Sequence, residues 1–177
     1  MLEEQGIPYH ESKYITSLLV QVAELAGGAG GVLGVSRHPG GPAVATSRDA
    51  GATFPGAMRV LTELPTPSCQ TSLLNAGCGA ARPACTADRL LISAPWSHAT
   101  RTNMTLSAGS AAGGWAAVVQ LSPTAAAAGG YSALAQTSDG RVLCMWEGPC
   151  GGAEPCGGGG EGPCGEAFCL ATVDIKL

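Results

Sequence analysis

Short apolar runs, each closed by turn residues, recur along the whole chain. Within most runs apolar and polar positions alternate, as on a strand with one buried face, and no run shows a helical period. The pattern predicts an all-β protein, either a sandwich or a propeller. About eleven strands are expected, over residues 16–25, 32–37, 43–47, 58–64, 69–74, 89–96, 101–106, 115–122, 131–137, 141–147 and 168–175.

The composition suits a single domain with many turns. The chain has 177 residues, of which 27 are glycine and only 12% are charged, as short strands and tight turns require. We expect a polar segment at 1–15 and a folded part at 16–177, with loops at 75–88 and 148–166. The second loop is so rich in glycine that ordering its backbone would cost more entropy than burial returns. It is predicted to be a mobile insertion.

Charge and cysteine content exclude several classes of function. A net charge of −4 gives no reason to expect a nucleic-acid partner, and no stretch approaches the ~20 apolar residues of a membrane span. The first residues lack a signal-peptide charge pattern, which leaves lysosomal, cytoplasmic and secreted locations open. Four of the eight cysteines have irregular spacing, which favours disulfides or free thiols over a metal site, and no cofactor is expected. These are Cys150, Cys156, Cys164 and Cys169.

One turn carries a recognisable local motif, "SRDAGATF" at 47–54. It resembles the Asp box, a β-hairpin turn that recurs in sialidases and in some other propellers. In such a turn Asp49 accepts backbone N–H groups, Gly51 permits a positive φ and Phe54 packs beneath the hairpin. The predicted role is structural for all five motif positions, which are Ser47, Asp49, Gly51, Thr53 and Phe54. A degenerate copy at 106–115 lacks the aspartate.

Further segments follow in a familiar order. "VLGVSR" ends at Arg37, "LPTPSCQTSLL" contains Gln70, "ISAPWSHATRTNMTL" contains Arg101, and "GGYSALAQTSDGRVLCMWEG" contains Tyr131 and Glu147. Together they resemble the C-terminal half of the exo-α-sialidase (neuraminidase) family, from about residue 16 onward. The resemblance implies a six-bladed β-propeller with four strands per blade, of which this chain covers about three blades. An open ring leaves two sheet faces uncovered, so we expect marginal stability or self-association.

The resemblance also implies roles for individual residues. Arg37 and Arg101 would belong to the arginine triad that binds the sialic acid carboxylate, which the planar guanidinium suits. Tyr131 would be the nucleophile, because a neutral phenol avoids the repulsion that a carboxylate would meet, and sialidases are known for it. Glu147 would hold an arginine in place. Gln70 matches a position near the sugar, but a buried glutamine bonded to backbone fits equally well.

Three departures from the family pattern keep three hypotheses open. A free tyrosine has a pKa of about 10 and needs a base, yet Leu19 stands where the activating glutamate is expected. The first triad arginine and the acid/base aspartate have no counterpart. One hypothesis is an exo-α-sialidase that hydrolyses terminal sialic acid from glycoproteins, glycolipids and oligosaccharides. The alternative is a non-catalytic propeller that binds sialic acid or a protein; an unrelated Asp-box propeller is a third.

Overall fold

A computed structural model of the chain describes residues 20–27, 30–77, 87–122, 124–125, 127–148 and 168–173. These residues form three antiparallel sheets and no helix, as the sequence predicts, so no helix among them could cross a membrane. The first sheet contains β1 (Val20–Glu24), β2 (Val32–Ser36), β3 (Ala43–Ser47) and β4 (Arg59–Val60). The middle sheet contains β5 (Ser72–Asn75), β6 (Leu90–Pro95), β7 (Met104–Ser110) and β8 (Gly113–Gln120). The last sheet contains β9 (Ser132–Gln136), β10 (Val142–Glu147) and β11 (Phe168–Val173).

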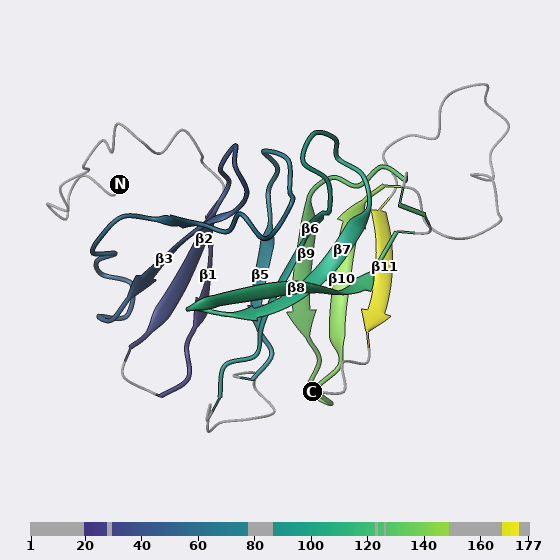
Figure 1. The fold of residues 1–177 in the computed structure, drawn as a ribbon. Helices are drawn as coiled ribbons and strands as arrows, with labels where there is room; N and C mark the ends of the chain where they lie inside the picture. The colour runs from purple at the N-terminus through teal and green to yellow at the C-terminus, as the bar shows by residue number, and fades with distance from the viewer. Residues whose placement is uncertain are drawn as a thin grey trace, which may run out of the picture.

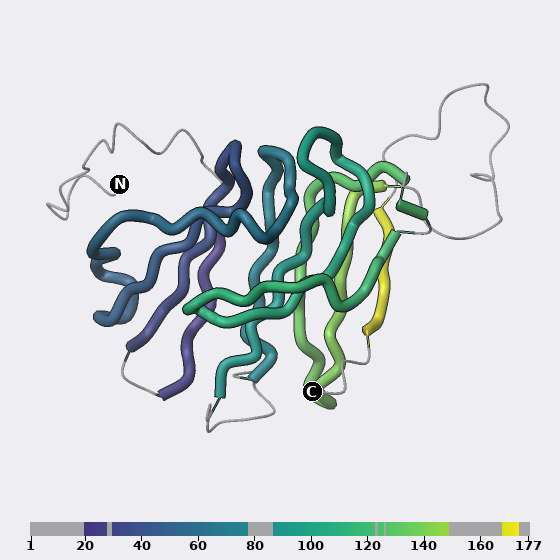
Figure 2. Tube along the Cα trace, in the orientation of Figure 1, coloured from purple at the N-terminus to yellow at the C-terminus, as the bar shows by residue number. Residues whose placement is uncertain are grey.

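Each sheet is a meander whose strands pair in chain order, and the three sheets lie side by side (Figure 1). β5 contacts β1 on one side and β9 on the other. The first strand of each sheet therefore lies next to the first strands of its neighbours, as in the blades of a propeller. The tube in Figure 2 follows the chain through the three sheets in turn. The all-β fold class predicted from the sequence is confirmed as part of a propeller.

Apolar side chains between the sheets form the core. Between the first and middle sheets, Leu33 and Val35 pack with Leu73 and Ile92. Between the middle and last sheets the cluster includes Leu106 and other buried side chains, among them Leu91 and Val142. Burying one such side chain contributes about 1.5–3 kcal/mol. In β6, Ile92 faces the first sheet and Leu91 faces the last sheet. Both faces of this strand are buried, and its sequence is therefore a continuous apolar run.

Polar contacts fix the first strands relative to one another. The Ser72 hydroxyl of β5 donates to Gln21 Oε1 of β1 at 2.9 Å and accepts the Leu134 N–H of β9 at 2.9 Å. One short side chain thus connects all three sheets. Because the bonds are largely buried, losing the hydroxyl would leave polar groups unpaired, which is costly. The Ser72 hydroxyl therefore fixes the position of β9 relative to β5 and β1.

Three strands, β4, β7 and β8, differ most from the predicted ranges. β4 has only two residues, because Leu61 and Leu64 leave the sheet in a turn closed by a Leu64 N–H to Leu61 C=O bond of 3.0 Å, and both side chains fill the core. The hairpin of β7 and β8 is longer than expected, with register shifts near Ser107 and Ala108. Its bulges hid the alternation that marks a regular strand. The 1–15 segment and most of both predicted loops lie outside the described residues.

Candidate active site

The predicted site residues lie at one rim of the sheets, the rim at which β1, β5 and β9 begin. In the antiparallel ladders, the ends of β2, β6 and β10 meet this rim too. Arg37 directly follows β2, Gln70 shortly precedes β5, and Arg101 lies between β6 and β7. Tyr131 directly precedes β9, and Glu147 ends β10. Five residues that are distant in sequence are therefore placed on one rim.

Arg101 and Tyr131 are in direct contact. The guanidinium carbon of Arg101 lies over the Tyr131 ring, 5.2 Å from its centroid, within the range of a cation–π interaction. The Gly129 N–H donates to the Arg101 C=O at 2.7 Å, which ties the two loops together. Tyr131 is 37% exposed and Arg101 is exposed. Both side chains are accessible to a ligand.

Glu147 binds the backbone at Tyr131. Its Oε2 accepts the Tyr131 N–H at 3.1 Å, and the backbone N–H of Glu147 donates to the Tyr131 C=O at 3.0 Å. A side chain at Gly130 would collide with the same carboxylate. Among the described residues the ion pairs are Arg59–Glu63 and Arg141–Asp139. No arginine of these residues pairs with Glu147, so its expected contact with an arginine stays a prediction, and its carboxylate positions the tyrosine loop.

Arg37 is held by a residue that the sequence analysis did not single out. The Arg37 Nε–H donates to the Ser68 hydroxyl at 3.0 Å, and Arg37 is half-buried. This bond uses the inner nitrogen, so the outer edge of the guanidinium remains for a ligand. The one feature of the sequence that could have pointed to Ser68 is its place in the same short segment as Gln70. No local pattern identifies a partner 31 residues away.

Cys69 is a buried residue beside the tyrosine loop. It is a free thiol, 2% exposed, and its sulfur lies 3.8 Å from the Gly130 carbonyl oxygen. Burial raises the pKa of the Cys69 thiol, the charges of Arg101 and Arg37 oppose this shift, and the charge of Glu147 adds to it. The thiol is therefore protonated at neutral pH and is a poor nucleophile.

Gln70 binds the backbone where β9 begins. It is 7% exposed; its Nε2 donates to the Ser132 C=O at 3.1 Å and its Oε1 accepts the Ser132 N–H at 2.9 Å. The Nε2 also donates to the Thr71 C=O at 3.1 Å. Gln70 thus fastens the residue after Tyr131, while Glu147 fastens Tyr131 itself. A contact between Gln70 and sugar stays a prediction.

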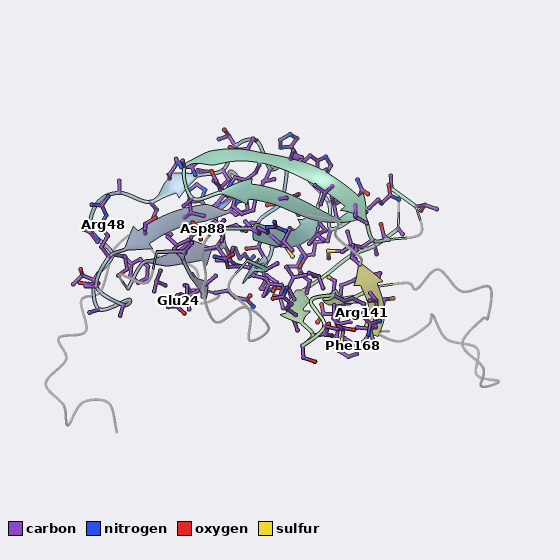
Figure 3. The ribbon with its side chains drawn as sticks, turned by 90° about the horizontal axis from the view of Figure 1, so that it is seen from below. Glu24, Arg48, Asp88, Arg141 and Phe168 are labelled. Atoms are coloured by element: carbon purple, nitrogen blue, oxygen red, sulfur yellow. The ribbon has the colours of Figure 1, made fainter. Side chains whose placement is uncertain are left out.

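The turn at 47–54 lies at the opposite rim, where β3 ends. Asp49 Oδ1 accepts the Thr53 N–H at 2.9 Å and the Ser47 hydroxyl at 2.6 Å, and Oδ2 accepts the Thr53 hydroxyl at 2.6 Å. The bonds from Ser47 and Thr53 lower the pKa of Asp49 to about 2. Gly51 has a φ of +87°, and the Phe54 ring packs against Gly34. In Figure 3, Arg48 marks this turn, far from Arg141 of the last sheet.

Other groups add little chemistry to the rim. Within the described ranges no residue bonds to the Tyr131 hydroxyl, and no three His, Cys, Asp or Glu side chains gather as metal ligands. Cys144 is a free thiol, and Cys169 is disulfide-bonded. Leu19, the residue at the expected position of the activating glutamate, lies outside the described residues. The described rim offers cations and a phenol.

Known structures of sialidases share this fold. The intramolecular trans-sialidase of Ruminococcus gnavus aligns with a TM-score of 0.54 at 22% identity, over 72% of this chain and 27% of its own. The Hadza microbial sialidase Hz136 gives 0.55 at 28% identity, over 73% and 25%. The NanB sialidase of Streptococcus pneumoniae gives 0.57 at 18% identity, over 72% and 20%. No protein-family model and no curated protein sequence matches the chain significantly.

The chain therefore has a sialidase-like fold, the class that its motifs resemble. It spans only 20–27% of the length of these three sialidases. The structural similarity concerns the fold of the three sheets and does not establish an activity.

Proposed function

We propose that the chain supplies the sugar-acid-binding rim of an exo-α-sialidase, a glycoside hydrolase acting on terminal sialic acid. The observation that carries this is that Arg37, Arg101 and Tyr131 lie at the same rim of the sheets, with the Arg101 guanidinium over the Tyr131 ring. Two guanidinium groups bind a carboxylate through paired, charge-assisted hydrogen bonds. A sugar that carries a carboxylate on its anomeric carbon brings that carbon close to the tyrosine.

Tyr131 acts as the nucleophile in this proposal. Its hydroxyl oxygen loses its proton and bonds to the anomeric carbon as the bond to the leaving sugar breaks and the leaving oxygen takes up a proton, so the protons balance; water then hydrolyses the glycosyl–tyrosine intermediate. The acid that protonates the leaving group has no counterpart in this sequence. The Arg101 guanidinium lies over the Tyr131 ring and orients it at the rim through a cation–π contact. The substrates are sialylated glycoproteins, oligosaccharides and glycolipids, gangliosides among them.

A second candidate is a non-catalytic propeller that binds sialic acid. The arrangement of Glu147 favours it, since the carboxylate beside Tyr131 accepts the main-chain N–H instead of the hydroxyl proton. Without a base at the hydroxyl, the phenol remains a weak nucleophile at neutral pH. Binding by the two arginines needs no such base. The two candidates therefore share a ligand and differ in turnover.

A fluorogenic α-sialoside separates the candidates. Turnover that Tyr131→Phe reduces at least ~100-fold, with sialoside binding retained, supports the hydrolase. Binding without turnover in the unsubstituted chain supports the second candidate. Arg101→Ala is expected to abolish binding in both cases, whereas Arg59→Ala, an arginine paired with Glu63 on the outer strand of the first sheet, serves as the matched control. Binding that survives Arg101→Ala unchanged would refute both.

Self-association, expected from the open ring, remains part of the proposal. Each end sheet has one face that no other described sheet covers, and large apolar side chains are exposed there. Sialylated glycans and further copies of the chain are thus the two kinds of partner proposed.

A further inference from the structure

The loop that carries Arg101 is paired with a segment that leads into Tyr131. We call residues 127–129 of the connection from β8 to β9 the strap, which ends two residues before Tyr131. Thr102 forms an isolated antiparallel bridge with the middle residue of the strap, Ala128. In such a bridge the two main chains run side by side and are joined by hydrogen bonds. Arg101 and Tyr131 are therefore connected through the main chain as well as through their ring contact.

Asn103 makes one of the two main-chain bonds of this pairing. Its N–H donates to the Ala127 C=O at 3.0 Å, and on the other side of the bridge the Gly129 N–H donates to the Arg101 C=O at 2.7 Å. The C=O of Asn103 accepts the Trp96 N–H at 2.9 Å, directly after the end of β6. Asn103 thus joins the strap to the end of β6, one through its N–H and the other through its C=O.

The backbone of Asn103 has a conformation that few residue types adopt. Its φ is +59°, in the left-handed region, which among the described non-glycine residues only Ala50 shares, at +57°. Asparagine tolerates this region better than most L-residues, whose Cβ comes too close to a carbonyl oxygen. The Oδ1 atom of Asn103 is buried and has no hydrogen-bond partner among the described residues. The left-handed backbone, rather than a bond of this oxygen, therefore accounts for an asparagine at this position.

We infer that Asn103 is a positioning residue of the candidate site, which sets the Arg101 guanidinium over the Tyr131 ring by holding the Arg101 loop against the strap. The angle between the two peptide planes that flank Asn103 depends on its φ, so another conformation would break one of its two bonds. Arg101 would then shift, whereas Glu147 still fixes the backbone of Tyr131. The consequence for binding a sugar carboxylate rests on the proposed function; the placement of Arg101 over the ring does not.

Calorimetry with an α-sialoside and with its carboxyl methyl ester tests this role in the full chain. Asn103→Val should reduce the acid-over-ester preference from at least ~10-fold to under ~2-fold, because valine is strained in the left-handed region. Asn103→Gly should retain the preference, since glycine adopts a positive φ freely. A mere loss of stability would weaken the binding of both ligands alike and leave their ratio unchanged. If circular dichroism shows that Asn103→Val is unfolded, Asn103→Ala provides the same comparison.

Ala50→Val is the matched control, because it places the same side chain on the other left-handed backbone, in the turn at the opposite rim. It should bind acid and ester as the unsubstituted chain does. An Asn103→Val variant that keeps the full preference would overturn the inference. An Asn103→Gly variant that loses the preference would also overturn it, because the side chain would then be what positions Arg101. Equal losses in Asn103→Val and Ala50→Val would do the same.

Proton NMR separates a failure of this inference from a failure of the proposed function. The ring current of Tyr131 shifts the side-chain protons of Arg101 upfield, because the guanidinium lies over the ring, and Tyr131→Leu identifies the shift by removing it. We expect the same shift in the unsubstituted chain and in Asn103→Gly, and a smaller shift in Asn103→Val. If the unsubstituted chain binds acid and ester equally, the proposed function fails and the shift decides. Equal shifts in Asn103→Val and the unsubstituted chain would then overturn the inference.

Discussion

The turn at 47–54 and the rim around Tyr131 are built in opposite ways. Hydrogen bonds of the turn join residues two to four positions apart, such as Ser47 with Asp49 and Asp49 with Thr53. Bonds that shape the rim join residues 16 to 62 positions apart, as between Tyr131 and Glu147 or between Ser132 and Gln70. A local motif therefore forms the turn, whereas the rim exists only when three sheets are in place. Substitutions at the rim should have the wider consequences.

Gln70→Ala is expected to have the largest effect on stability. The substitution leaves the buried N–H and C=O of Ser132 without partners, which lowers the free energy of unfolding by about 2–3 kcal/mol. Chemical denaturation measures this. Gln120→Ala, which loses one bond to the Ser122 C=O at the surface, is the control and should cost under ~0.5 kcal/mol. Equal effects of the two substitutions would show that Gln70 does not fasten β9.

Gly130→Ala should follow in size. The added Cβ would lie 2.9 Å from Glu147 Cβ and collide with its carboxylate, so the strand moves or the Tyr131 N–H bond breaks. Such overpacking costs about 1–3 kcal/mol. Sialoside binding measured by calorimetry should weaken as well, because Tyr131 shifts relative to Arg101. Gly40→Ala, where the nearest atom is 3.5 Å away, should change neither quantity; an unchanged Gly130→Ala variant would contradict the close approach.

Ser68→Ala tests the support of Arg37 and should act on binding more than on folding. Loss of the Nε–H to hydroxyl bond is worth about 0.5–1.5 kcal/mol, which corresponds to a roughly 2- to 12-fold weaker Kd for a sialoside. Ser97→Ala, which removes an exposed hydroxyl bonded to Thr100, is the control. If both variants bind like the unsubstituted chain, Arg37 does not need Ser68.

Asp49→Asn should have the smallest effect, confined to the turn and dependent on pH. Hydrogen bonds from Ser47 and Thr53 lower the pKa of Asp49 to about 2 in the folded chain, below the usual value of about 3.9. The carboxylate therefore stabilises the fold fully above about pH 4 and loses this contribution as the pH falls through about 2. The difference in Tm between the unsubstituted chain and Asp49→Asn should shrink over that range, with sialoside binding unchanged. A difference that grows toward low pH would reverse the assigned sign.

The fold was predicted well from the sequence, because each strand shows its own alternation of apolar and polar residues. Alternation within each run marked most strands, and the bonding of Asp49 followed from its spacing to Ser47 and Thr53. The motif order placed Arg37, Arg101 and Tyr131 in one family-like sequence, and the structure puts Arg101 and Tyr131 in contact. Side-chain contacts between loops that are distant in sequence were predicted less well. The bond from Arg37 to Ser68 and the bond from the Tyr131 N–H to Glu147 were both missed, because each joins residues that are distant in sequence.

The central claim is that Arg37 and Arg101 bind the carboxylate of a sugar acid at the rim of Tyr131. Calorimetry with an α-sialoside and with its carboxyl methyl ester, on the unsubstituted chain and on the Arg37→Ala, Arg101→Ala double variant, tests it most directly. The account predicts that the unsubstituted chain binds the acid at least ~10-fold more tightly than the ester, and that the double variant shows no such preference. Equal binding of acid and ester by the unsubstituted chain would contradict the claim.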